Sequence, residues 1–119
     1  MTTTSSMMSK FTQDKNLNTF EGWQELLLAV TYYAENTVET DDEIEEKLFA
    51  QSGLRALHAL LSFMKSDGLD GVYAVLEREF ERQRLSMVTL GDLDSMRAFY
   101  STEFTRLLFL KVKELRSSS

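Results

Sequence analysis

The chain has 119 residues, of which 43% are hydrophobic and 27% are charged, with a net charge of −6. This length is typical of one domain with a substantial core. Because there is no cysteine and only one histidine, disulfides, thiolate metal sites, thiol catalysis and a multi-histidine metal site within one chain are excluded.

Hydropathy and charge narrow the class of protein further. No apolar run approaches the roughly 18 residues that cross a bilayer, and the N-terminus lacks the apolar stretch of a secretory signal. We therefore expect a cytoplasmic protein with no membrane segment. Residues 1–50 hold three basic and ten acidic residues, whereas residues 51–119 hold ten basic and nine acidic ones. This acidic half argues against direct nucleic-acid binding.

The absence of proline and the recurrence of apolar residues every three or four positions predict an all-α protein. We expect a compact bundle of about five helices in a single domain over residues 18–116. Residues 1–17 are rich in Thr, Ser and Met and show no period, so we expect a flexible, disordered N-terminal tail there. Residues 117–119 form a second, short tail.

The first helix is predicted over about 19–35, with Asn18 and Glu21 as its cap. Its core stripe consists of Phe20, Trp23, Leu27, Val30 and Ala34. The opposite stripe carries Leu28 and Tyr32 among glutamates, and Tyr33 adjoins them. An apolar pair with a polar rim is typical of a protein-binding patch. The alternative is that another helix covers this face.

Residues 35–47 form an acidic segment in which seven of thirteen residues are Asp or Glu. Thr40 and Glu43 form a predicted capping box that begins a helix over about 41–51, with Ile44 and Leu48 facing inward and Phe49 beside them. The carboxylates that we expect to attract a basic partner protein are Glu39, Asp41, Asp42 and Glu45.

Two more helices are predicted over about 54–65 and 70–85, separated by a stop at Gly68 and a cap at Asp70. The inward stripes are Leu54, Leu57, Leu61 and Met64 in the first of these, and Val72, Leu76 and Phe80 in the second. The outward stripe of the first is Arg55, His58, Ser62 and Lys65.

His58 is the single histidine of the chain. An outward histidine with cations one turn away, on a helical bundle, is the layout of a histidine phosphotransfer domain. Such domains carry lysine and glycine three and four residues after the histidine, where this chain has Leu61 and Ser62. A phosphotransfer carrier that uses His58 is therefore the alternative hypothesis, and an ordinary surface histidine is the simpler one.

After a linker at 86–91, the last helix is predicted over about 92–115 and is apolar nearly all round, including Leu108 and Phe109. Such a helix is buried on more than one side or lies in an oligomer interface. Its apolar excess makes Leu108 and Phe109 candidate protein-binding residues. The chain has no Glu-x-x-His pair, glycine-rich phosphate loop or nucleophile motif. We expect no enzyme activity, cofactor or metal. The preferred hypothesis is a small acidic adaptor, inhibitor or regulatory subunit that binds another protein and forms homo-oligomers.

Overall fold

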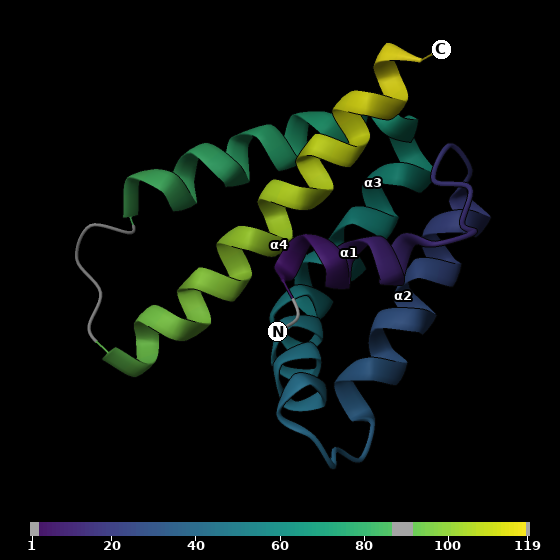
Figure 1. The fold of residues 1–119 in the computed structure, drawn as a ribbon. Helices are drawn as coiled ribbons and strands as arrows, with labels where there is room; N and C mark the ends of the chain where they lie inside the picture. The colour runs from purple at the N-terminus through teal and green to yellow at the C-terminus, as the bar shows by residue number, and fades with distance from the viewer. Residues whose placement is uncertain (1–2, 87–91, 119) are drawn as a thin grey trace.

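The computed structural model describes residues 3–86 and 92–118, and its four elements in that part of the chain are all helices. They are α1 (Thr4–Thr12), α2 (Phe20–Glu35), α3 (Asp41–Ser86) and α4 (Asp92–Ser117). The predicted all-α class is confirmed, whereas the count differs from the expected five. Figure 1 shows the short α1 lying across the bundle between α4 and α2. Residues 87–91, which hold most of the predicted linker, lie outside the described residues.

The segment that we expected to be a flexible tail contains α1, which is part of the bundle. The side chain of Thr3 caps this helix by accepting a hydrogen bond from the Ser6 amide. Met7, Met8 and Phe11 are buried in the core. Their spacing places all three on one face of a helix, and this burial is what holds the segment on the bundle.

The N-cap of α2 is Thr19, one residue after the predicted cap Asn18, and its hydroxyl accepts a 3.1 Å hydrogen bond from the Gly22 amide. The Trp23 indole Nε1 donates a 2.7 Å bond to the Leu17 carbonyl and so satisfies two polar groups within the core. Trp23, Leu26, Val30 and Ala34 are buried. Leu27, predicted in the core stripe in place of Leu26, packs only at its edge.

α3 is bent at Gly68, whose φ of 69° lies in the left-handed region that favours glycine. We call residues 41–67 the first arm and residues 69–86 the second arm. The predicted stop at Gly68 is therefore confirmed. The predicted break near Gly53 is wrong, because the first arm is continuous there. The Phe104 ring of α4 occupies the space that a Cβ of Gly53 would need, so this glycine allows close helix packing.

The first arm is rotated relative to the prediction. Ile44 and Leu48, expected to face inward, are 43% and 40% exposed, while Phe49 is fully buried. The Phe49 ring lies 5.8 Å from that of Phe11 and 5.2 Å from that of Phe104. Burial of this large aromatic cluster outweighs burial of the two aliphatic side chains.

The other two predicted inward stripes are confirmed in part, because Leu57, Met64, Val72 and Leu76 are buried whereas Leu54, Leu61 and Phe80 are only partly buried. Phe104, Leu108 and Val112 form the buried stripe of α4, which packs against both arms of α3. The stripe that we expected to face outward on the first arm, Arg55, His58, Ser62 and Lys65, is exposed, as predicted. No helix in the described part of the chain is both long enough and apolar enough to cross a bilayer.

Candidate functional site

The outward face of α2 carries an exposed apolar pair, which we call the Leu28/Tyr32 patch. Leu28 is 70% exposed and Tyr32 is 62% exposed. They lie one helical turn apart, so their side chains are neighbours. The exposed carboxylates of Glu21, Glu25 and Glu35 surround the patch. In the described part of the chain no helix covers this face, which was the alternative that the sequence left open.

Tyr33 supports this patch from below and is half-buried. Its ring centroid lies 5.0 Å from that of Phe11 and 5.4 Å from that of Tyr32, which it meets edge-on. The Lys10 ammonium lies 5.1 Å above the same ring, within the range of a cation–π contact. Tyr33 is thus held between Phe11, Lys10 and Tyr32, and it offers only part of its own surface to a partner.

The acidic segment lies where the chain enters α3. The Thr40 hydroxyl accepts a 3.2 Å hydrogen bond from the Glu43 amide, so the predicted cap is confirmed. The Glu43 carboxylate accepts a bond from the Glu39 amide. Asp41 and Asp42 are exposed in the first turn, where the helix dipole favours negative charge.

Glu45 differs from the other predicted carboxylates because it is only partly exposed. It lies near Tyr100 of α4, whose phenol pKa is raised first by burial and then by this carboxylate. Glu45 therefore faces the neighbouring helix, whereas Asp41 and Asp42 face solvent.

Leu108 and Phe109, the two residues of α4 that we expected on a binding surface, differ in their exposure to solvent. Leu108 is fully buried and belongs to the core, because α4 is packed against both arms of α3 at this point. Phe109 is partly buried, with ring centroids 5.3 Å from Tyr73 and 5.7 Å from Phe80. Among the α4 side chains that the structure describes, from residue 97 onward, the large apolar ones that are exposed are instead Phe99 and Leu110.

His58 lies on the exposed face of the first arm, together with Arg55 and Lys65. An accessible imidazole with cations on the same helix face is one part of the layout of a histidine phosphotransfer domain. The positions three and four residues later are held by Leu61, which is partly buried, and Ser62, which is exposed.

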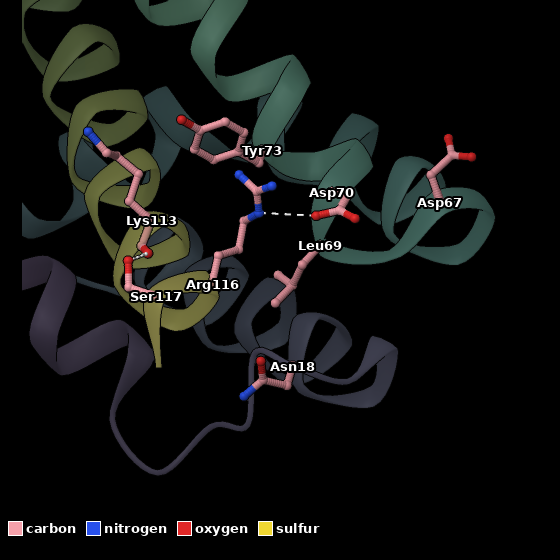
Figure 2. Close-up of a pocket in the computed structure, with 8 residues that line it drawn as sticks. All are labelled: Asn18, Asp67, Leu69, Asp70, Tyr73, Lys113, Arg116 and Ser117. Carbon is pink, nitrogen blue, oxygen red and sulfur yellow. Dashed lines mark hydrogen bonds and ion pairs between the residues drawn. The ribbon is translucent and has the colours of Figure 1, made fainter. Parts of the chain in front are cut away.

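Sequence reasoning did not find a cleft of about 600 Å³ between α4 and the bend of α3. Figure 2 shows Arg116 between the Tyr73 ring and the Asp70 carboxylate. The guanidinium carbon lies 4.0 Å from the ring centroid, and Nε donates a 3.0 Å bond to Asp70. Asp70, predicted to cap the second arm, thus pairs with α4. These contacts join distant segments and leave a cleft of mixed charge.

A second cleft, of about 380 Å³, lies between the two arms of α3 and α4. Its floor is apolar, with Ala56, Leu60 and Leu76, and charged side chains stand at its edge. The Glu79 pKa is lowered because the carboxylate accepts hydrogen bonds from Arg82. The pair largely neutralises this side of the cleft.

Comparisons with known proteins add no family to this description, because no protein-family model, curated protein or solved structure matches the chain. Among the described residues, no group of three or more His, Asp or Glu side chains is placed to hold a metal ion.

Proposed function

We propose that this protein is a non-enzymatic protein-binding module that acts through the outward face of α2. One observation carries the proposal: Leu28 and Tyr32 are both more than 60% exposed on one face of a well-packed helix. Exposing two large apolar side chains side by side is costly for solubility, and adjacent apolar residues with a polar rim are typical of interaction surfaces.

The surroundings of the patch support a specific kind of partner. Tyrosine is enriched among the residues that dominate binding energy, and Tyr32 rests on the anchored ring of Tyr33. The carboxylates around the patch and at Glu39, Asp41 and Asp42 give this end of the molecule a negative potential. A basic partner would be attracted to it, mainly through a faster association rate. An adaptor, inhibitor or regulatory subunit would use such a surface.

Affinity capture from the native host, followed by identification of the bound protein, tests the proposal. Leu28→Glu and Tyr32→Glu should each reduce capture of that protein while the helical circular dichroism signal stays unchanged. Leu110→Glu is the matched control, because Leu110 is an exposed leucine on α4, 47% exposed. If all three variants retain the partner equally, or if the two α2 variants unfold, the patch is not the binding surface.

The exposure of His58 beside Arg55 and Lys65 supports a second candidate function, that of a phosphotransfer carrier. It predicts a covalent label on one named residue, whereas the binding module predicts none. The two proposals are therefore separable by a single labelling experiment, which is described in the Discussion.

A further inference from the structure

The outward face of the first arm of α3 holds a second apolar surface, separate from the Leu28/Tyr32 patch. Ile44 and Leu48 are 43% and 40% exposed. Asp41 lies before them and Arg55 after them along the same face, and both are exposed. We call these four residues the α3 stripe.

The two charged ends of the stripe are symmetric about Leu48, while Ile44 has Ser52 as its counterpart on the other side of Leu48. Asp41 and Arg55 each lie seven residues from Leu48, which is about 10.5 Å along the axis and about 20° around it in an α-helix. If two copies of the arm lie antiparallel with a two-fold axis at Leu48, each Asp41 comes opposite the Arg55 of the other copy. The two Leu48 side chains then meet at the axis, with the Ile44 side chains beside them.

Neither charge of this stripe is satisfied within the described part of the chain, where Asp41 and Arg55 form no ion pair. Arg55 also lines the cleft of about 380 Å³ between the two arms of α3 and α4. The other two charged side chains that line this cleft, Glu79 and Arg82, pair with each other. The stripe is therefore complementary to itself: negative at one end, apolar in the middle and positive at the other. An isologous interface requires this kind of self-complementarity.

We propose that two copies of the chain form an antiparallel dimer through the α3 stripe, with a two-fold axis at Leu48. Contact along one helix face buries less than a standard protein interface, so the dimer is weak and its population rises with protein concentration. Its two Asp41–Arg55 ion pairs are exposed to solvent, where dissolved salt screens the attraction between the charges. The dissociation constant of the dimer therefore rises with ionic strength. The homo-oligomer that the apolar character of the last helix led us to expect thus forms through α3.

Cross-linking of single thiols tests the position of the axis, since the chain has no cysteine of its own. In the dimer the Leu48→Cys thiols face each other, so a short bis-maleimide reagent should join two copies. Phe63→Cys is the matched control, because Phe63 is 38% exposed but lies well away from the axis. The expected yield for Leu48→Cys is at least several times that of the control. Equal yields, or no dimer with either variant, would overturn the proposal.

A charge exchange tests the pairing. Asp41→Arg should raise the dissociation constant measured by sedimentation equilibrium by about tenfold, because two attractive pairs become repulsive. Asp41→Arg combined with Arg55→Asp should restore it. Asp42→Arg makes the same charge change in the same helical turn but off the stripe, and should have little effect. A monomer at all concentrations up to about 1 mM, equal effects of Asp41→Arg and Asp42→Arg, or a failure of the double variant to restore association would each contradict the dimer.

Neither test depends on the α2 proposal. Leu28→Glu should leave the dimer intact. Asp41→Arg leaves the side chains of the Leu28/Tyr32 patch unchanged and should only slow association with a basic partner, as Asp42→Arg also does, because both remove a carboxylate of the acidic segment. Loss of the dimer by Asp41→Arg alone is therefore distinguishable from failure of the α2 proposal.

Discussion

The Phe104 ring of α4 lies directly against the backbone of Gly53 in the middle of the first arm of α3, where any Cβ would collide with the ring. Phe104 is itself buried among other aromatic rings, including that of Phe49 at 5.2 Å. This contact sets how closely α3 and α4 approach each other. It also fixes the rotation of the first arm, and with it the outward position of Ile44 and Leu48.

Gly53→Ala is therefore expected to destabilise the protein, although alanine is the better helix former by about 1 kcal/mol. The added methyl group forces a buried ring to move, and overpacking of this kind costs about 1–3 kcal/mol. The free energy of unfolding in urea measures the effect. Ser62→Ala, on the exposed side of the same arm, should change it by less than about 0.5 kcal/mol. An increase in stability for Gly53→Ala would mean that α4 does not pack here.

The link between α1 and α4 predicts a pH dependence. The Thr4 hydroxyl and the Arg106 guanidinium both donate to the Glu103 carboxylate, at 2.7 Å and 2.9 Å. The pKa of Glu103 is lowered below 4.5, mainly by the bond from Arg106. A carboxyl group with a depressed folded-state pKa contributes its full stability above its unfolded-state value of about 4.5, and loses it as pH falls through the lower folded-state value.

Glu103→Gln should accordingly be less stable than the wild type near neutral pH, by about 1 kcal/mol, since the carboxylate is partly buried and its ion pair is partly exposed. The difference should shrink as the pH falls through the lowered folded-state pKa of Glu103, where the wild-type carboxyl group becomes protonated. Urea denaturation at several pH values measures it. A difference that stays constant with pH would show that the charge of Glu103 contributes nothing to folding.

The core position of α1 predicts a large effect from a residue that composition assigned to a tail. Phe11 is fully buried and its ring contacts those of Tyr33 and Phe49. Phe11→Ala should lower the free energy of unfolding by about 3–5 kcal/mol. Ser6→Ala, at an exposed position of α1, is the control. A change of less than about 0.5 kcal/mol for Phe11→Ala is the size expected of a surface position. Such a result would contradict the packing of α1 and support the flexible tail predicted over residues 1–17.

Local signals in the sequence predicted much of this fold. Thr40 and Gly68 mark a helix start and a bend because a cap and a left-handed glycine act within a few residues. The outward position of His58 also followed from helical period. The core of α2 was predicted except that Phe20 is only partly buried and that Leu26 takes the place of Leu27. Leu26 and Leu27 are neighbours, and which of them is buried depends on which helices cover each side.

The errors have a common physical cause, which is contact between distant segments. Met7 and Phe11 are buried by residues far along the chain, such as Phe49 against Phe11. The local Thr- and Ser-rich sequence does not predict these contacts. Gly53 was interpreted as a helix break. The residue that explains a glycine at this position is Phe104, whose ring packs against it and which lies about 50 residues later in sequence. For the candidate site, Leu28 and Tyr32 were identified from their helical spacing opposite the core stripe. Whether such a side chain is exposed depends on the packing of the helices, which leaves Leu28 and Tyr32 exposed and buries Leu108.

The phosphotransfer alternative makes one clear prediction. If His58 accepts a phosphoryl group, incubation with a phosphorylated response-regulator-type donor should label the protein, and His58→Gln should abolish the label. The label should also be acid-labile, as expected of a phosphoramidate. The binding-module proposal predicts no label and no effect of His58→Gln on partner affinity. A label that depends on His58 would favour the carrier over the binding module.

The central claim is that the Leu28/Tyr32 patch of α2 binds another protein. It is tested most directly by the dissociation constant of the captured partner for the wild type and for Leu28→Glu, measured by titration calorimetry. We predict that Leu28→Glu weakens binding by about 30-fold or more, as for a residue that dominates an interface, while the circular dichroism spectrum and stability remain those of the wild type. An unchanged dissociation constant for a folded Leu28→Glu protein would contradict the account.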